Sequence, residues 1–240
     1  MAQQSDSIMA ALSPHCRVCR VPLAGVWAIP PRVLRGVHRH SKNPNYCNIC
    51  GEKDIKGEIA EITVLFADIR GFTPLTSALG PMRIKELLDE YFRAVSQILY
   101  EQDAIVDHFL GDAVMAFFNQ PVRHADHTQR AVKSAREILR VVDWLNSRWE
   151  LAQPVGVGVG ISTGFAAVGT VGSTNPTDYT AIGDVVNLAA RLQTVAEAGR
   201  ILVTSEVYEQ VRDVFPNARG LSLEVKGFPG PVAAFALGEQ

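Results

Sequence analysis

The sequence predicts an α+β fold preceded by a small cysteine-rich module. From about residue 58 onward, strand-like and helix-like segments follow one another in the order strand–helix–strand–strand–helix–strand. This is the ferredoxin-like βαββαβ arrangement, here with further strands added after it. Ahead of that region, all 4 cysteines of the chain are gathered between residues 16 and 50.

Charge changes at the same place in the chain. Residues 1–57 carry eight basic and three acidic side chains, a net charge of +5, whereas residues 58–240 carry fifteen and twenty-two, a net charge of −7. We therefore expect two domains, 1–57 and 58–240. The overall charge of −2 gives no electrostatic case for a nucleic-acid partner. Without a bilayer-length apolar stretch or a signal-peptide pattern, we expect a cytoplasmic protein with no membrane partner.

The first elements of the second domain follow from local patterns. Residues 61–67 form a short apolar run with β-branched side chains, which is typical of a central strand. Thr73 followed by Pro74 predicts a helix start with Thr at the N-cap. Gly80-Pro81 predicts the start of a long amphipathic helix, because apolar residues follow it at helical spacing.

The next segments predict a hairpin and a second long helix. Residues 104–110 and 113–118 have the pattern of strands, and the pair Gly111-Asp112 between them is a turn signal. A helix is expected over residues 124–149, where apolar residues again recur at helical spacing.

A glycine-rich strand and the C-terminal elements complete the fold. Residues 155–161 alternate glycine with β-branched residues, so a helix or another backbone is expected to pack closely on the glycine face. A helix over 184–198 is expected to be closed by Gly199. Three final strands are predicted near residues 201–203, 221–226 and 231–237.

The cysteines form two CxxC pairs, Cys16-x-x-Cys19 and Cys47-x-x-Cys50. Four thiolates are the ligand set of a tetrahedral structural Zn²⁺. The stretch has too few apolar residues to fold alone, so stabilisation by a bound metal is physically reasonable. An iron–sulfur cluster uses the same ligands, whereas two disulfides are disfavoured in a cytoplasmic protein. Gly51 predicts a tight turn that aims backbone N–H groups at sulfur.

Other residues of the module leave alternatives open. His15, His38 and His40 are either substitute metal ligands or solvated histidines. The basic residues form a face for a partner or keep the module soluble; they are Arg32, Arg35, Arg39 and Lys42.

Two aspartates are the candidate catalytic metal ligands. Asp68 ends the first strand and Asp112 lies in the hairpin turn. We expect the first strand to be central and to pair beside the second, so that the two carboxylates meet at one edge. Adjacent buried carboxylates repel each other unless they are protonated or bridged by cations. Oxygen ligands of this kind suit Mg²⁺ or Mn²⁺, particularly when substrate phosphates complete the shell.

Three strings of residues carry a family resemblance. They are FADIRGFT at 66–73, FLGDAVMA at 109–116 and YTAIGDVVNLAAR at 179–191. Together, and in this order, they resemble the class III adenylyl/guanylyl cyclase catalytic domain, and the similarity covers essentially all of 58–240. The resemblance implies the nucleotidyl cyclase fold.

The resemblance also implies a set of site residues. Asp68 and Asp112 would bridge two metal ions per site, Mg²⁺ or Mn²⁺, with the carbonyl of Ile69 as a further ligand. One ion would activate the ribose 3′-hydroxyl while the other holds the phosphates, the two-metal arrangement for in-line displacement. The helix N-terminus at Phe72 and Thr73 offers free N–H groups to phosphate oxygens.

Further residues are implied on the other side of the nucleotide. Asn187 and Arg191, spaced i, i+4 on one helix face, would orient the ribose and stabilise charge on the α-phosphate. Lys226 would hold the terminal phosphates. In the family, these residues and the metal ligands come from different subunits, so a chain carrying both sets is expected to form a head-to-tail homodimer.

His108 and Thr180 stand at the positions that contact the base in the family. Imidazole and hydroxyl groups each donate or accept hydrogen bonds, so these two residues alone do not decide between adenine and guanine. Thr180 is the adenylyl-like choice, which favours ATP as substrate and cyclic AMP as product. The alternatives are a guanylate or dual-specificity cyclase and a catalytically weak nucleotide-binding regulatory module.

Overall fold

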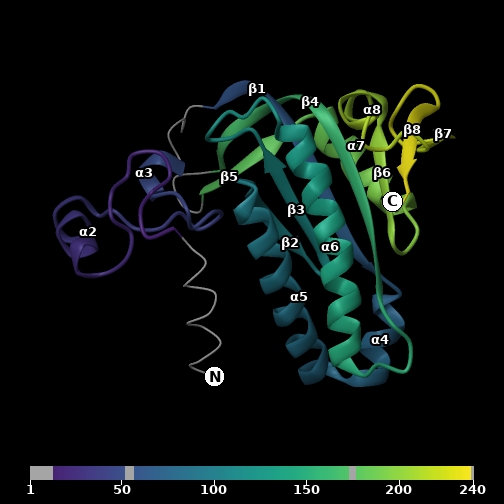
Figure 1. The fold of residues 1–240 in the computed structure, drawn as a ribbon, viewed down its shortest axis with the longest axis horizontal. Helices are drawn as coiled ribbons and strands as arrows, with labels where there is room; N and C mark the ends of the chain where they lie inside the picture. The colour runs from purple at the N-terminus through teal and green to yellow at the C-terminus, as the bar shows by residue number, and fades with distance from the viewer. Residues whose placement is uncertain (1–12, 52–56, 173–176, 239–240) are drawn as a thin grey trace.

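The computed structural model describes residues 13–51, 57–172 and 177–238. The strands are β1 (Glu58–Arg70), β2 (Ile105–Leu110), β3 (Ala113–Phe118), β4 (Gly156–Gly172), β5 (Thr177–Ile182), β6 (Arg200–Thr204), β7 (Arg219–Leu223) and β8 (Val232–Leu237). The helices are η1 (Val26–Ala28), α2 (Ile29–Arg35), α3 (Asn48–Gly51), α4 (Phe72–Leu79), α5 (Pro81–Glu101), α6 (His127–Trp149), α7 (Asp184–Val195) and α8 (Ser205–Val211). The strands form one sheet, in the order β2-β3-β1-β4-β6-β8-β7, and β5 pairs with β4 off this path (Figure 1).

The central strand is β1, which pairs antiparallel with β3 on one side and β4 on the other. The order β2-β3-β1-β4 is the ferredoxin-like one, so the predicted fold class is confirmed. The expectation that the first strand pairs beside the second is wrong, because β2 pairs with β3 instead. The crossover through α5 carries the chain past the position next to β1, and the tight turn after β2 then brings β3 into it.

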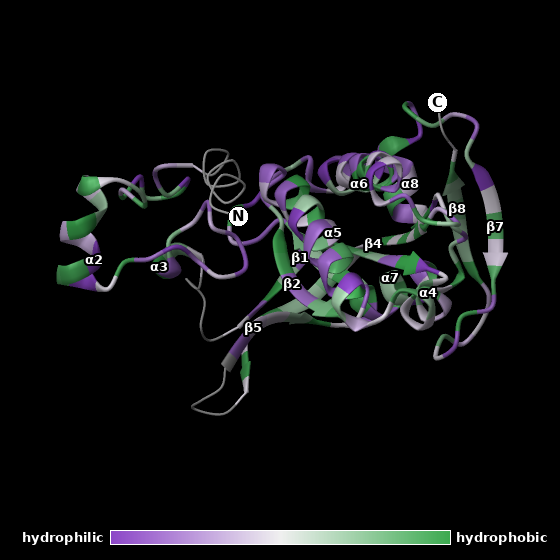
Figure 2. Ribbon diagram, turned by 90° about the horizontal axis from the view of Figure 1, so that it is seen from below, coloured by the Kyte–Doolittle hydropathy of each residue, from purple (hydrophilic) through white to green (hydrophobic). Residues whose placement is uncertain are grey.

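Helices cover both faces of the sheet. One face packs against α5 and α6 through buried residues such as Tyr91, Leu99 and Ile138. The other face packs against α7, where Val185 and Ala189 are buried. Figure 2 shows α5 and α6 on one side of the sheet and α7 on the other. None of the helices in the described ranges combines the length and apolar character needed to cross a membrane.

The glycine face of β4 lies against α7, as predicted. A Cβ atom added at Gly160 would lie 2.2 Å from the backbone nitrogen of Gln193 and 2.3 Å from the carbonyl oxygen of Ala189. At Gly156 it would lie 2.5 Å from the Cβ of Ala198. No side chain fits at these separations, so the glycines allow α7 and the residues after it to pack directly on β4. This close packing lets Gln193 of α7 reach Asp68 near the end of β1.

Several boundaries differ from the sequence prediction. α7 ends at Val195, and Gly199 adopts a left-handed conformation (φ 73°) in the turn before β6, where its N–H donates to the carbonyl of Val157. β7 ends at Leu223, so Lys226 lies in the turn that follows rather than in a strand. β5 and α8 had no sequence prediction, because such short segments show too little periodicity.

The N-terminal module packs against the edge strand β2. The N–H of Val106 donates to the carbonyl of Lys42 (3.0 Å), and the side-chain amide of Asn43 donates to the carbonyl of Ala104 (2.8 Å). Tyr46 of the module is buried in the same hydrophobic cluster as Ile62 of β1. The module therefore satisfies and covers a sheet edge that would otherwise be exposed. The domain boundary at residue 57 stays a prediction.

Candidate functional site

The two candidate metal aspartates lie at the same end of two neighbouring strands. Asp68 pairs in register with Ala113, the residue that follows Asp112. Gly111 takes a left-handed conformation (φ 65°), which forms the tight turn between β2 and β3 and holds Asp112 at the start of β3. Because β1 and β3 are adjacent, the turn brings the two carboxylates together across the strand end.

Two residues that the sequence did not single out hold Asp68. Arg70 donates from Nη1 to Oδ2 of Asp68 (2.9 Å), and Gln193 donates from Nε2 to the same oxygen (2.8 Å). Arg70 also donates to the carbonyl of Gln193. Gly158 leaves the room for this arginine, since a Cβ there would lie 2.4 Å from Nη2. Both bonds reach the same carboxylate oxygen of Asp68, Oδ2.

Electrostatics at this end of the sheet fit a cation. Burial, and then the nearby Asp68 carboxylate, raise the pKa of Asp112 above its usual value. Beneath them, Tyr91 is fully buried, and its hydroxyl has no hydrogen-bond partner in the described part of the chain. Burial and both aspartates raise the pKa of Tyr91. Two converging carboxylates that repel each other are a donor set that a divalent cation with oxygen ligands would relieve.

The predicted phosphate-binding segment follows directly after these residues. α4 begins at Phe72, and its N-cap is Gly71 in a left-handed conformation (φ 72°). The prediction that Thr73 caps this helix is therefore wrong, since Thr73 and Pro74 already lie within its first turn. Thr73 is exposed, whereas the side chain of Ile69, which carries no metal-binding atom, is buried in the core.

The predicted ribose and phosphate residues face solvent. Asn187 and Arg191 are both exposed on α7, one turn apart, while Gln193 of the same helix points inward to Asp68. Residues 191 and 193 are separated by roughly 200° around the helix axis. Arg191 therefore points away from the Asp68 of its own chain. Lys226 is also exposed.

The predicted base-contacting residues are brought together around one buried carboxylate. The hydroxyl of Thr180 donates to Oδ2 of Asp107 (2.6 Å), and Nδ1 of His108 lies 3.2 Å from the same oxygen. Nε2 of His108 lies 2.6 Å from Oδ2 of Asp178. The ammonium group of Lys42, from the N-terminal module, contacts both of these aspartates. Neither aspartate was a predicted site residue, and Lys42 was predicted only as one of the four basic residues of the module.

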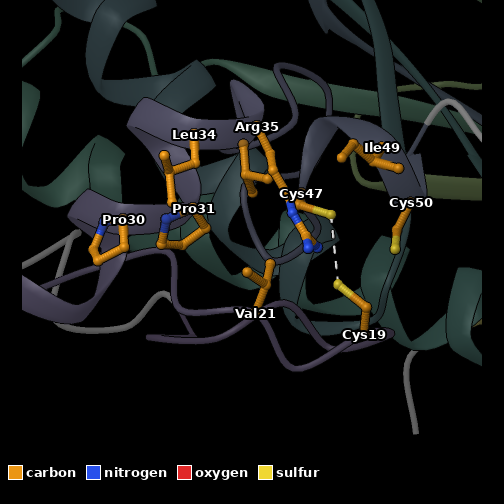
Figure 3. Close-up of a pocket in the computed structure, with 10 residues that line it drawn as sticks. Cys19, Val21, Pro30, Pro31, Leu34, Arg35, Cys47, Ile49 and Cys50 are labelled. Carbon is orange, nitrogen blue, oxygen red and sulfur yellow. Dashed lines mark hydrogen bonds between the residues drawn. The ribbon is translucent and has the colours of Figure 1, made fainter.

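The four cysteines converge as a second candidate site. Their sulfur atoms all lie within 4.8 Å of one another, and none of the cysteines is in a disulfide. Figure 3 shows the sulfur atoms of Cys19 and Cys47 facing each other, at 3.7 Å, beside an apolar pocket under α2. Four thiols gathered in this way could bind a metal ion.

Backbone groups around the sulfur of Cys16 favour a thiolate there, whereas burial raises the pKa values of Cys47 and Cys50 in the metal-free chain. Burial raises the pKa of Cys16, but hydrogen bonds from the backbone of Cys19, Cys47 and Val18 outweigh it and lower that pKa to about 7. The N–H of Cys47 lies 3.3 Å from the Cys16 sulfur. The tight turn expected at Gly51 is present, since the N–H of Gly51 donates to the carbonyl of Cys47 (2.8 Å), and the backbone of Cys50 in the same turn hydrogen-bonds to the sulfur of Cys47.

The histidines and basic residues of the N-terminal module lie in different environments. His15, His38 and His40 are not part of the cysteine cluster among the described residues. Arg39 turns inward to donate to backbone carbonyls, and Lys42 turns toward β2. The four basic residues therefore do not share one surface, because two of them satisfy internal acceptors.

The chain matches the family described as Adenylate and Guanylate cyclase catalytic domain over residues 55–238. It is 33% identical to Adenylate cyclase 1 of Rhizobium meliloti over 159 residues, which cover 64% of this chain and 24% of that protein. It is 34% identical to the uncharacterized protein Mb2235 of Mycobacterium bovis, covering 99% of this chain and 55% of that protein. The chain thus spans well under half of the curated adenylate cyclase relatives that it matches.

Solved structures give the same family. The structure of the adenylyl cyclase CyaB from P. aeruginosa is similar with a TM-score of 0.74 and 34% identity, covering 77% of this chain and 96% of that one. The guanylyl cyclase Cya2 is similar with a TM-score of 0.71 and 30% identity, covering 76% and 95%. With the family match spanning most of its length and the fold agreeing, the chain belongs to the adenylate and guanylate cyclase catalytic domain family.

Proposed function

We propose that this chain is an adenylate cyclase, which converts ATP to 3′,5′-cyclic AMP and pyrophosphate at the interface of a homodimer. The observation that carries the proposal is the convergence of Asp68 and Asp112 at the shared end of β1 and β3. Relatives named adenylate cyclase at 32–33% identity support ATP as the substrate.

The metal ions of this proposal are Mg²⁺ or Mn²⁺, held by Asp68, Asp112 and the carbonyl of Ile69. Bound there, they would supply Lewis-acid polarisation of the ribose hydroxyl and the phosphate oxygens. The backbone N–H groups of Phe72 and Thr73 bind phosphate oxygens at the start of α4, where the helix dipole favours negative charge.

The second protomer supplies the remaining residues. Arg191 points away from the Asp68 of its own chain, so it meets the phosphates held by the partner's aspartates. There it neutralises charge on the α-phosphate, while Asn187 on the same helix face orients the ribose. Lys226 neutralises the terminal phosphates, which gather charge as pyrophosphate leaves.

The purified chain tests the activity directly. We expect cyclic AMP and pyrophosphate from ATP in the presence of Mn²⁺ or Mg²⁺, at a higher kcat/KM than cyclic GMP from GTP. Both products are measured side by side by chromatography. A clear preference for GTP would make the chain a guanylate cyclase. Binding of both nucleotides with no cyclic product from either would instead support a regulatory module.

For the cysteine cluster we propose a structural Zn²⁺. The purified protein is expected to contain about one zinc per chain by elemental analysis, because four thiolates satisfy the tetrahedral shell. Cys50→Ser should remove most of the zinc and lower the Tm by about 5 °C or more, since metal binding contributes to folding. Ser41→Ala, an exposed change in the same module, is the matched control. Iron and sulfide in place of zinc would contradict the assignment.

A further inference from the structure

The side chain of Lys42 crosses from the N-terminal module into the cyclase domain. Its ammonium group has three acceptors: a carboxylate oxygen of Asp107, Oδ1 of Asp178 (2.6 Å) and the backbone carbonyl of Tyr179 (2.6 Å). An ammonium group has three N–H donors, so all of them are used. With 13% of the side chain exposed, this is a largely buried ion-pair centre rather than a surface lysine.

Of these three acceptors, Asp107 is the one that also contacts Thr180, and its side chain is completely buried. Lys42 occupies Oδ1, and Oδ2 receives the hydroxyl of Thr180 at 2.6 Å. A carboxylate paired with an ammonium group can only accept hydrogen bonds. The Thr180 proton is therefore directed at Asp107, and the oxygen of Thr180 is left with lone pairs alone for any further partner.

Because the Thr180 hydroxyl donates to Asp107, its oxygen can distinguish adenine from guanine. Adenine carries an exocyclic amino group, a donor that an oxygen lone pair can accept. Guanine carries a carbonyl oxygen at the same place, which faces that lone pair unfavourably. His108 is held by the same acidic pair, through Asp178 and Asp107.

We propose that Lys42 is a positioning residue which, through Asp107, fixes Thr180 as a hydrogen-bond acceptor and so sets the preference of the site for adenine over guanine. The proposal rests on the proposed function, in which Thr180 faces the base. The N-terminal module would then contribute to base specificity through Lys42. The other residues of this network, Asp107, His108, Asp178 and Thr180, all lie within residues 58–240.

A metal ion is the other occupant that this cluster would suit. Asp107, His108 and Asp178 offer ligand atoms within 4.8 Å of one another. The ammonium of Lys42 contacts both carboxylates, however, and already supplies the positive charge that they require. The geometry therefore favours a lysine-centred network.

The first test is Lys42→Met, which keeps the apolar stem and removes the three donors. We expect the ratio of kcat/KM for ATP to kcat/KM for GTP to fall about tenfold, the effect of one lost directional hydrogen bond. The change should appear mainly as a higher KM for ATP. Lys133→Met, an exposed change on α6, should leave the ratio unchanged. A purely structural role for Lys42 would lower the activity with both nucleotides equally, and that result would overturn the proposal.

Thr180→Val provides the coupling test. If Lys42 acts through Thr180, the ATP-to-GTP ratio of Thr180→Val should already be low, and adding Lys42→Met should not lower it further. Full additivity of the two effects would contradict the proposal. If Lys42→Met does not fold, as judged by circular dichroism and thermal melting, Lys42→Leu also removes the three donors and gives the same readout.

Binding separates this proposal from the proposed function. ATP and GTP affinities are measured by calorimetry with Ca²⁺ for the wild type and Lys42→Met. If the wild type forms no cyclic nucleotide, the proposed function fails, but the preference in binding still tests Lys42. A wild-type preference for ATP that is lost in Lys42→Met supports the proposal, and an equal preference in both proteins overturns it.

Discussion

Asp112→Asn is expected to lower cyclase activity by about a thousandfold while making the metal-free protein slightly more stable. The loss of activity follows because an amide cannot replace a carboxylate that bridges two cations, and a thousandfold corresponds to about 4 kcal/mol of barrier. The gain in stability follows from burial and from the repulsion of Asp68, which raise the pKa of Asp112 in the folded chain.

The direction of the stability effect depends on pH. A carboxyl group whose folded pKa is raised favours folding below its ordinary pKa, and this contribution is lost as the pH rises through the raised value. Above the raised pKa the charged carboxylate destabilises the folded chain, and asparagine removes this cost. Allowing for solvent screening, we expect the Tm of metal-free Asp112→Asn to exceed that of the wild type by about 1–3 °C at pH 7. This difference in Tm should become smaller as the pH falls toward about 4.

Calorimetric melting at several pH values, with and without Mn²⁺, measures both effects of Asp112→Asn. Mn²⁺ should raise the Tm of the wild type and have little effect on the variant, because only the wild type has the complete ligand pair. Asp143→Asn, an exposed change on α6, controls for removal of one negative charge. A Tm for Asp112→Asn below that of the wild type at pH 7 would show that the two carboxylates do not repel each other as the structure indicates.

Mixing two inactive variants is expected to restore activity. Asp68→Ala lacks a metal ligand, and Arg191→Ala lacks the charge that meets the α-phosphate, so each homodimer has two defective sites. In a mixed dimer both defects fall in one site and the other site is intact. Random association of equal amounts gives half mixed dimers with one working site each, so we expect about a quarter of wild-type activity.

The complementation assay requires subunit exchange, which is ensured by mixing in mild denaturant followed by refolding, or by co-expression with two different affinity tags. Arg191→Ala mixed with Asn187→Ala is the matched control, because both defects lie on the same side of the nucleotide and every mixed dimer keeps one defect in each site. Recovery in that control equal to the recovery in the test mixture would argue against the head-to-tail arrangement.

Local sequence patterns determined the order of the elements and several of their bounds. The hairpin over 104–118 is an example, because Gly111 imposes the turn and the flanking segments are rich in apolar residues. The glycine face of β4 was predictable for the same kind of reason, since only close packing explains glycine at every second position. The convergence of Asp68 and Asp112 then followed from the ferredoxin-like topology, even though the neighbour of β1 is β3 rather than β2.

Tertiary structure alone decided which residues hold those aspartates and which surround the base-contacting pair. Gln193 bonds to Asp68 across 125 positions of sequence, and Lys42 bonds to the carbonyl of Tyr179 across 137. Local pattern cannot report such contacts, because a side chain's spacing along the chain carries no information about a distant partner. Burial is the physical reason they form, since a carboxylate such as Asp107 within the fold requires a cation, and the fold brought one from the N-terminal module.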